Sequence, residues 1–155
     1  MTLVVLVGGA RSGKSTLAVE RAAAEGAPVT FIATGEAGDE EMAARIALHR
    51  AERPTDWTTI EEPVDVRGAI DSVPTGDTVI VDCLSLWVAN GGDGAVLAPR
   101  AGLTIAVTNE VGLGIVPENA LARAYRDDLG RVNASWVDAA DEAYFVVAGR
   151  MLRLS

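Results

Sequence analysis

The stretch GGARSGKS, residues 8–15, decides how this chain folds, because it fits the pattern GxxxxGK[ST] and separates two kinds of secondary structure. Before it, TLVVLV (2–7) is a continuous apolar run that predicts a buried strand. After it, STLAVERAAAEG (15–26) has helical character and ends in Gly26, a typical C-terminal helix cap. A strand, a glycine-rich loop and a helix in this order predict a phosphate-binding P-loop.

Each part of this loop has a chemical reason. Glycines let the backbone curl, so that successive N–H groups and the helix N-terminus point at one anion. Lys14, the only lysine beside twelve arginines, would act catalytically on the β and γ phosphates, and the Ser15 hydroxyl would ligate Mg²⁺. A glycine-rich turn without a ligand is the alternative. The predicted nucleotide-binding residues here are Gly8, Gly9, Ala10, Arg11, Ser12, Gly13, Lys14 and Ser15.

Apolar strands and helical stretches alternate along the rest of the chain, which predicts an α/β fold with a doubly wound, mostly parallel sheet. Residues 1–155 are expected to form one domain. A ligand would then bind at the carboxyl ends of the strands. The further expected strands are 28–35, 77–87, 103–109 and 142–149, and the expected helices are 39–53, 64–71 and 117–140.

Asp82 follows four apolar residues, which is the Walker B pattern of a carboxylate that holds Mg²⁺ directly or through water. We therefore expect Ser15 and Asp82 to form the metal site. The alternative is an aspartate that only caps the next turn. Its neighbour Cys83, the one cysteine, is expected to be a small buried hydrophobe rather than a reactive thiol.

The only histidine, His49, lies among arginines in HRAERPTDW (49–57). In a helix over 39–53, Arg45 and His49 share a face, and Arg53 extends that stripe if the helix continues until Pro54 stops it. The arginines would bind a polyphosphate and keep the imidazole neutral and nucleophilic near pH 7. The alternative is a solvated helix residue among ordinary surface arginines.

The net charge of −9 works against binding to nucleic acid or to an anionic membrane surface, because both need a basic face. The apolar run at the N-terminus ends at Val7 and has no basic leader, and no segment approaches a membrane-spanning length. We expect a cytoplasmic protein that holds its anionic ligands locally.

Several motifs together resemble the family of bifunctional adenosylcobinamide kinase/adenosylcobinamide-phosphate guanylyltransferases, the CobU/CobP type. The resemblance covers nearly the whole chain, and its most specific parts are the runs HRxxRPxxW and NEVGxGIVPEN. It implies phosphorylation of adenosylcobinamide by a nucleoside triphosphate, ATP or GTP. Transfer of GMP from GTP to that phosphate would follow. The motifs are GGARSGKS, IATG, ARIALHRAERPTDWTTIEEP, DCLSLWVAN, TNEVGLGIVPENALARAYRDDLGRVN and ADEAYFVVAG.

The same resemblance implies site residues, a fold and an assembly. In the family the GMP passes through a covalent histidine, and His49 matches it. A RecA-like P-loop fold and a homotrimer are implied as well. Further nucleotide contacts carry over onto Ala33, Thr34, Gly35, Arg50, Ala51, Glu52, Arg53, Glu61 and Asp82.

The chain departs from the family between its third and fourth expected strands, where only GGDGAVLAPRAG (91–102) replaces a longer insert with a helix. A crossover between parallel strands usually contains a helix. We therefore expect apolar surface left exposed here or covered by a neighbouring subunit. The loop NEVGLGIVPEN (109–119) is expected at the substrate site, with Pro117 in the first turn of the last helix. A plain glycine-bearing turn is the alternative.

Other function classes fit less well. A GTPase-like switch needs an Asn-Lys-x-Asp guanine reader, and the only lysine lies in the P-loop. The DxxG match at 127–130 lies inside a helical pattern, where it cannot serve as a switch loop. A plain P-loop kinase that leaves His49 idle is the stronger alternative, whereas a purely structural protein would leave the P-loop unexplained.

Overall fold

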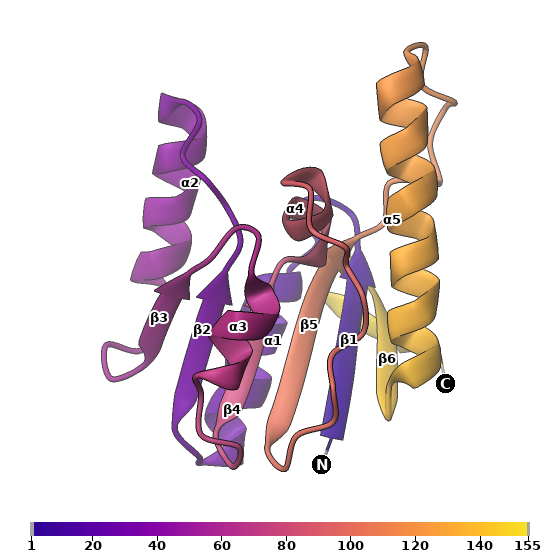
Figure 1. Cartoon of the computed structure of the whole chain (residues 1–155). Coiled ribbons are helices and arrows are strands. Elements are labelled where there is room, and N and C mark those ends of the chain that lie inside the picture. Colours follow the sequence, from indigo (N-terminus) through magenta and orange to yellow (C-terminus); the bar gives the residue numbers. More distant parts are fainter. Residues whose placement is uncertain (1, 155) are drawn as a thin grey trace.

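The computed structural model describes residues 2–154 as a seven-stranded sheet with helices on both faces (Figure 1). The strand order is β3-β2-β4-β5-β1-β6-β7, and every pair is parallel except β6 and β7. The strands are β1 Thr2–Gly8, β2 Val29–Ala33, β3 Thr58–Glu61, β4 Thr78–Asp82, β5 Leu103–Asn109, β6 Glu142–Val147 and β7 Arg150–Arg153. The helices are α1 Lys14–Glu25, α2 Glu40–Ala51, α3 Val66–Asp71, α4 Leu84–Ala89 and α5 Ala120–Ala139.

The core consists of two apolar clusters, one on each face of the sheet. Successive side chains of a strand point to opposite faces, so Val4 and Leu6 of β1 pack in the cluster that includes Ala18 of α1. Val5 of the same strand packs in the other cluster, which includes Trp136 of α5. Strands buried on both faces are typical of parallel sheets, so the predicted doubly wound architecture is confirmed.

Three short elements were not predicted. β3 and β7 are edge strands with no buried residue, so they lack the apolar signal of a central strand. α4 begins inside 77–87, which was expected to be strand throughout, and continues to Ala89. That expectation is wrong beyond Asp82, since an apolar run cannot by itself separate a buried strand from a buried helix.

Two helix boundaries also differ from the prediction. α2 ends at Ala51, so Arg53 lies outside the helix, as the steric effect of Pro54 on the preceding residue favours. α5 begins at Ala120 because the Asn119 side chain accepts the Ala122 backbone N–H at 2.7 Å and caps the helix. Pro117 is therefore in the loop and not in the first helical turn.

The connection from β4 to β5 passes through the short helix α4 and then the segment 91–102, which contains no helix and covers the sheet face itself. Gly94 is buried against α5, and its carbonyl accepts the Trp136 indole N–H at 2.7 Å. Val96 and Leu97 pack against the cluster that contains fully buried Trp136. The expectation that apolar surface is left uncovered at this face is therefore wrong.

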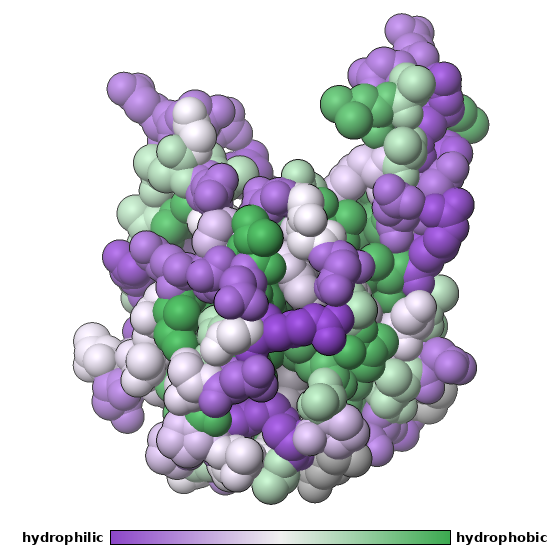
Figure 2. All heavy atoms as spheres, viewed as in Figure 1, coloured by the Kyte–Doolittle hydropathy of each residue, from purple (hydrophilic) through white to green (hydrophobic). Residues whose placement is uncertain are grey.

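Two arms rise beyond the carboxyl ends of the strands, α2 on one side and the start of α5 on the other (Figure 1). Figure 2 shows a hollow between them. α2 has no buried residue. The second arm includes the loop before α5, where apolar side chains are exposed; Ile115 is 97% exposed. The exposed apolar residues of this arm are Val111, Leu113, Ile115, Val116 and Leu121.

Candidate active site

A cavity of about 500 Å³ lies where the P-loop, α2 and the carboxyl ends of β2, β4 and β5 meet. Ligands of open α/β sheets bind at this edge. Polar residues from the P-loop, α2 and β4 share the lining with an apolar wall. The lining residues are Ala10, Arg11, Ser12, Gly13, Lys14, Ser15, Thr16, Phe31, Ala33, Gly35, Met42, Arg45, Ile46, Leu48, His49, Glu52, Arg53, Glu61, Asp82, Cys83, Leu86, Val107 and Asn109.

The P-loop can curl tightly because two of its positions are glycines, where a side chain would be crowded by the backbone behind the loop. A Cβ on Gly8 would collide with the Val146 carbonyl. Gly13 has φ +101°, and a Cβ there would lie 3.2 Å from Gly149 Cα. Gly149 also donates its backbone N–H to the Ser12 carbonyl at 2.7 Å. The turn after β6 therefore supports the loop from behind.

Lys14, Ser15 and Asp82 come together at one end of the cavity. The Ser15 hydroxyl donates to Asp82 Oδ2 at 2.6 Å, and Lys14 Nζ donates to the Gly9 carbonyl at 2.6 Å. Burial lowers the pKa of Lys14, and the Asp82 carboxylate partly offsets this effect. Asp82 does not cap α4, whose N-cap is Cys83, so the alternative structural role for this aspartate is not seen.

The opposite wall carries His49 and the arginines. Arg45 pairs with Glu41 at 2.9 Å, and Arg50 pairs with Glu61 from β3. His49 Nδ1 lies 3.8 Å from Glu52 Oε2. Although Arg53 is outside the helix, it still lines the cavity with Arg45 and His49.

Arg53 is held from the sheet side. Its guanidinium carbon lies 3.5 Å from the centroid of the Phe31 ring, and Nη1 donates to the Thr59 hydroxyl at 3.2 Å. Burial lowers the pKa of Arg53, while the nearby Asp82 carboxylate raises it. The cation–π contact and the hydrogen bond fix this guanidinium at the wall of the cavity.

Cys83, Ser15 and Lys14 are poorly placed to act as nucleophiles in this cavity. Cys83 is buried, as predicted, and burial raises the pKa of its thiol to about 11, so the thiolate is scarce. The Ser15 hydroxyl is bonded to Asp82, and the Lys14 ammonium lies inside the P-loop. His49 is half exposed on the cavity wall and is the remaining candidate.

Five predicted nucleotide contacts lie off the cavity lining. Gly8 packs against the Val146 carbonyl, and the Gly9 carbonyl accepts a hydrogen bond from Lys14 Nζ. Thr34 is fully buried, and its hydroxyl donates to the Cys83 carbonyl at 2.7 Å. Arg50 is paired with Glu61, and Ala51 is exposed at the end of α2. All the other predicted site residues line the cavity.

Sequence analysis missed the apolar wall and a buried polar support. Met42 and Ile46 are four residues apart on α2, and both line the cavity with Leu86. Asn133 is 7% exposed and stands between Leu129 and Trp136 on the buried face of α5. A polar residue at an apolar-face position of a predicted helix is the signal that could have identified it.

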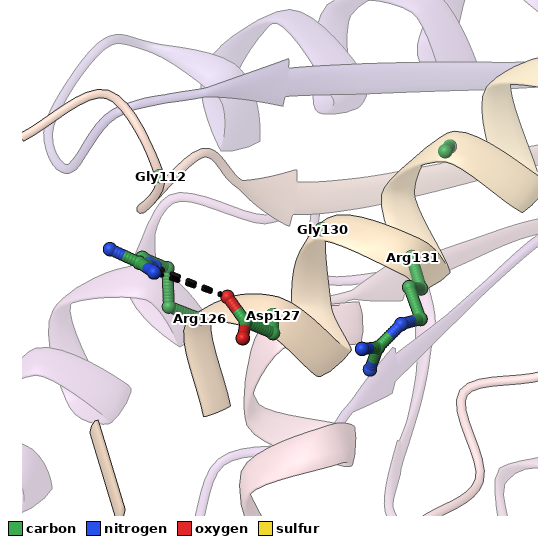
Figure 3. Close-up of a pocket in the computed structure, with 6 residues that line it drawn as sticks. Gly112, Arg126, Asp127, Gly130 and Arg131 are labelled. Carbon is green, nitrogen blue, oxygen red and sulfur yellow. Dashed lines mark hydrogen bonds and ion pairs between the residues drawn. The ribbon is translucent and has the colours of Figure 1, made fainter. Parts of the chain in front are cut away.

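A second, open hollow of about 680 Å³ lies on α5 beside Gly112 (Figure 3). Arg126 pairs with the adjacent Asp127 at 3.3 Å, and Arg131 points away from them. This hollow shares no residue with the P-loop cavity. Its charged side chains pair with their helix neighbours, so it forms no reactive cluster.

Among the described residues, no helix is long and apolar enough to span a bilayer. A family model described as cobinamide kinase / cobinamide phosphate guanyltransferase matches residues 4–154. The chain is 41% identical over 160 residues to the bifunctional adenosylcobalamin biosynthesis protein CobP of Pseudomonas aeruginosa, covering 94% of this chain and 92% of the relative.

CobU of Salmonella typhimurium, a bifunctional adenosylcobalamin biosynthesis protein, is 37% identical over 176 residues, which cover 95% of this chain and 96% of the relative. That alignment is longer than the present 155 residues, so this relative contains residues that the chain lacks. Among solved structures, the flagellar accessory protein FlaH from Methanocaldococcus jannaschii matches with a TM-score of 0.54 and 15% identity, covering 99% of this chain and 78% of FlaH. This likeness concerns the fold alone.

Proposed function

The chain belongs to the cobinamide kinase / cobinamide phosphate guanyltransferase family, and we propose that a single cavity, lined by the P-loop and His49, performs both reactions. The enzyme is bifunctional and acts in adenosylcobalamin biosynthesis. One observation carries the assignment of the site: the P-loop lysine and the only histidine line the same cavity. A triphosphate held by the P-loop would therefore meet the imidazole.

In the kinase step, the P-loop holds the triphosphate of the donor, ATP or GTP, with Lys14 against its β and γ phosphates. The hydroxyl of the aminopropanol group of adenosylcobinamide attacks the γ phosphorus. The nucleoside diphosphate leaves with the electron pair of the broken bond. No protein nucleophile is needed, since positioning and charge stabilisation supply most of the catalysis.

In the guanylyl transfer step, a ring nitrogen of His49 attacks the α phosphorus of GTP, and pyrophosphate leaves. The phosphate of adenosylcobinamide phosphate then attacks the same phosphorus and releases the histidine, giving adenosyl-GDP-cobinamide. Arg53 and Arg45 stand on the same wall and would neutralise the triphosphate. Local cations explain how a chain with a net charge of −9 binds this anion.

The residues at the end of the P-loop fit Mg²⁺. A hydroxyl and a carboxylate, Ser15 and Asp82, lie together, and Mg²⁺ in nucleotide sites is typically held by one or two protein oxygens plus phosphates. The ion would neutralise charge on the β and γ phosphates. Ser15 and Asp82 would hold this ion, and Lys14 would bind the phosphates.

Asp82→Asn should raise the Mg²⁺ concentration needed for half-maximal activity about tenfold, because a neutral amide oxygen binds the cation more weakly than a carboxylate. A Mg²⁺ titration of both reactions measures the change. Asp77→Asn, on the loop before β4 and away from the cavity, is the matched control. An unchanged Mg²⁺ requirement in Asp82→Asn would assign the aspartate a structural role.

Mass spectrometry of the intact protein tests the proposal directly. After incubation with GTP and Mg²⁺, and without any corrinoid, the protein should carry the added mass of one GMP. A plain P-loop kinase, the alternative function, would bind GTP but form no adduct. An unmodified protein under these conditions would contradict guanylyl transfer through a covalent adduct, and the cavity would then be assigned to the kinase reaction alone.

The corrinoid is proposed to contact the loop 109–119, which leaves β5 at the cavity. Asn109 lines the cavity, and Glu110 donates its backbone N–H to the Gly8 carbonyl at 3.0 Å, so the loop begins against the P-loop. Its exposed apolar side chains would pack against the corrin ring. We place the reaction in the cytoplasm, where the nucleotide substrates are available.

We also propose a homo-oligomer, a trimer as the family resemblance implies, that assembles through β7. Leu152 of this edge strand and Leu154 directly after it are exposed, and edge strands are common sites of association between chains. Light scattering should give a mass about three times the monomer mass of 16.1 kDa. For Leu152→Lys the measured mass should fall to that of the monomer. A monodisperse monomer of the unchanged protein would contradict the assembly.

A further inference from the structure

Asn109 holds a central place in the sheet. It is the last residue of β5, the strand between β4, which ends in Asp82, and β1, which leads into the P-loop. In the pairing of β1 with β5 it stands opposite Gly8. Since carboxyl ends of neighbouring parallel strands meet at one edge, Asn109 lies between the carboxylate and the P-loop, and it lines their cavity.

The backbone of Asn109 is held from both sides. Asn133 of α5 donates its Nδ2–H to the Asn109 carbonyl at 2.9 Å, and the Asn109 N–H donates to the Ser85 hydroxyl at 3.2 Å. Asn133 is itself oriented, because Thr108 donates its hydroxyl to Asn133 Oδ1 at 2.6 Å. A buried amide in an otherwise apolar helix face is costly unless it is satisfied, so this network fixes the end of β5.

The side chain of the same residue is free. Within residues 2–154, the Asn109 amide group makes no hydrogen bond, although its main chain is bonded on both sides. An amide has two N–H donors and carries no charge, so it can bond phosphate oxygens without repelling them. A fixed backbone with a free donor beside the phosphate site is the arrangement expected of a group that stabilises a transition state.

We propose that the Asn109 amide donates a hydrogen bond to the γ-phosphoryl group during the kinase step, with Asn133 as its positioning residue; this rests on the proposed function. In that step the corrinoid hydroxyl oxygen bonds to the γ phosphorus while the bond from the β–γ bridging oxygen breaks. The electron pair stays on the nucleoside diphosphate, and the hydroxyl proton passes to water. The amide stabilises charge on the equatorial oxygens. Guanylyl transfer reacts at the α phosphorus and depends less on it.

The test compares the two reactions in the full-length Asn109→Ala protein. The kcat for ATP-dependent phosphorylation of adenosylcobinamide should fall about 100-fold, the usual loss for one transition-state donor. The rate at which label passes from α-labelled GTP to the protein, measured at saturating GTP, should fall no more than about threefold. A kinase kcat near that of the wild type, or equal losses in both reactions, would overturn the assignment.

Two further variants test the positioning role. Asn133→Asp keeps the volume and the acceptor for Thr108 but removes the donor to the Asn109 carbonyl, so the kinase kcat should fall about tenfold with the KM for ATP little changed. Thr108→Val keeps that donor and should lower the melting temperature more than the kcat. Equal kcat in Asn133→Asp and Thr108→Val would contradict the role of Asn133. A wild-type protein that takes no label would instead contradict the proposed guanylyl transfer.

Discussion

His49→Asn should abolish the covalent GMP adduct and guanylyl transfer while most of the kinase activity is retained. The adduct needs a nucleophile at the cavity, and the His49 imidazole is half exposed on the cavity wall. Phosphoryl transfer uses the hydroxyl of the substrate and needs no protein nucleophile. The measurement is radiolabel on the protein after incubation with α-labelled GTP, alongside phosphorylation of adenosylcobinamide.

The chemistry of the label gives an independent check. A phosphorus–nitrogen bond to histidine hydrolyses in acid and survives base, unlike a phosphate ester on serine. Arg45→Gln, one turn away on α2 and also at the cavity, is the matched variant; it should weaken GTP binding yet still accept label. Label that persists in His49→Asn, or that resists acid in the wild type, would make His49 a solvated helix residue and the enzyme a kinase only.

Lys14→Ala should abolish both activities, with losses of about 10³-fold or more in each, because one P-loop holds the triphosphate for both reactions. Lys14→Arg separates charge from shape. The guanidinium restores the positive charge, but it is planar and too wide for the place where Lys14 Nζ lies 2.6 Å from the Gly9 carbonyl. We expect Lys14→Arg to be nearly as inactive as Lys14→Ala.

Steady-state rates of kinase and guanylyl transfer, with GTP binding by calorimetry, measure this effect. A thermal unfolding midpoint close to that of the wild type shows that the loop still folds. If either activity persists near the wild-type rate in Lys14→Ala, the two reactions do not share one P-loop, and the single-cavity proposal is wrong.

The parallel sheet and the P-loop could be predicted from the sequence because both produce local sequence patterns. Long apolar runs specify buried strands, and the spacing of Gly8, Gly13 and Lys14 specifies the loop. Ser15 and Asp82 are separated by 67 residues, and their proximity was expected because the P-loop and Asp82 each follow a predicted strand at its carboxyl end. The edge strands β3 and β7 were missed because they bury too little to show a pattern.

The cavity wall could not be predicted in the same way. Met42, Ile46 and Leu86 are ordinary apolar residues whose contact depends on how α2 and α4 lie over the sheet. The support of Asn109 by Asn133 joins the end of β5 to the interior of α5, and no spacing rule relates their positions. Arg53 does line the predicted site, but contacts with Phe31 and Thr59 position it there, and not a continuation of the helix as predicted.

The segment 91–102 is expected to unfold locally more easily than the rest of the chain. No residue from 93 to 101 donates a backbone–backbone hydrogen bond within the described chain, so this covering segment lacks the cooperative ladder of a helix. Its attachment depends on side chains, chiefly the Trp136 indole on Gly94 and the Arg100 guanidinium on the Asp77 carbonyl. Local opening should therefore cost less free energy than global unfolding, and its amides should exchange with solvent before those of the central strands. The segment 91–102 thus covers one face of the core but can detach locally. When it does, the otherwise buried side chain of Trp136 becomes transiently exposed to water.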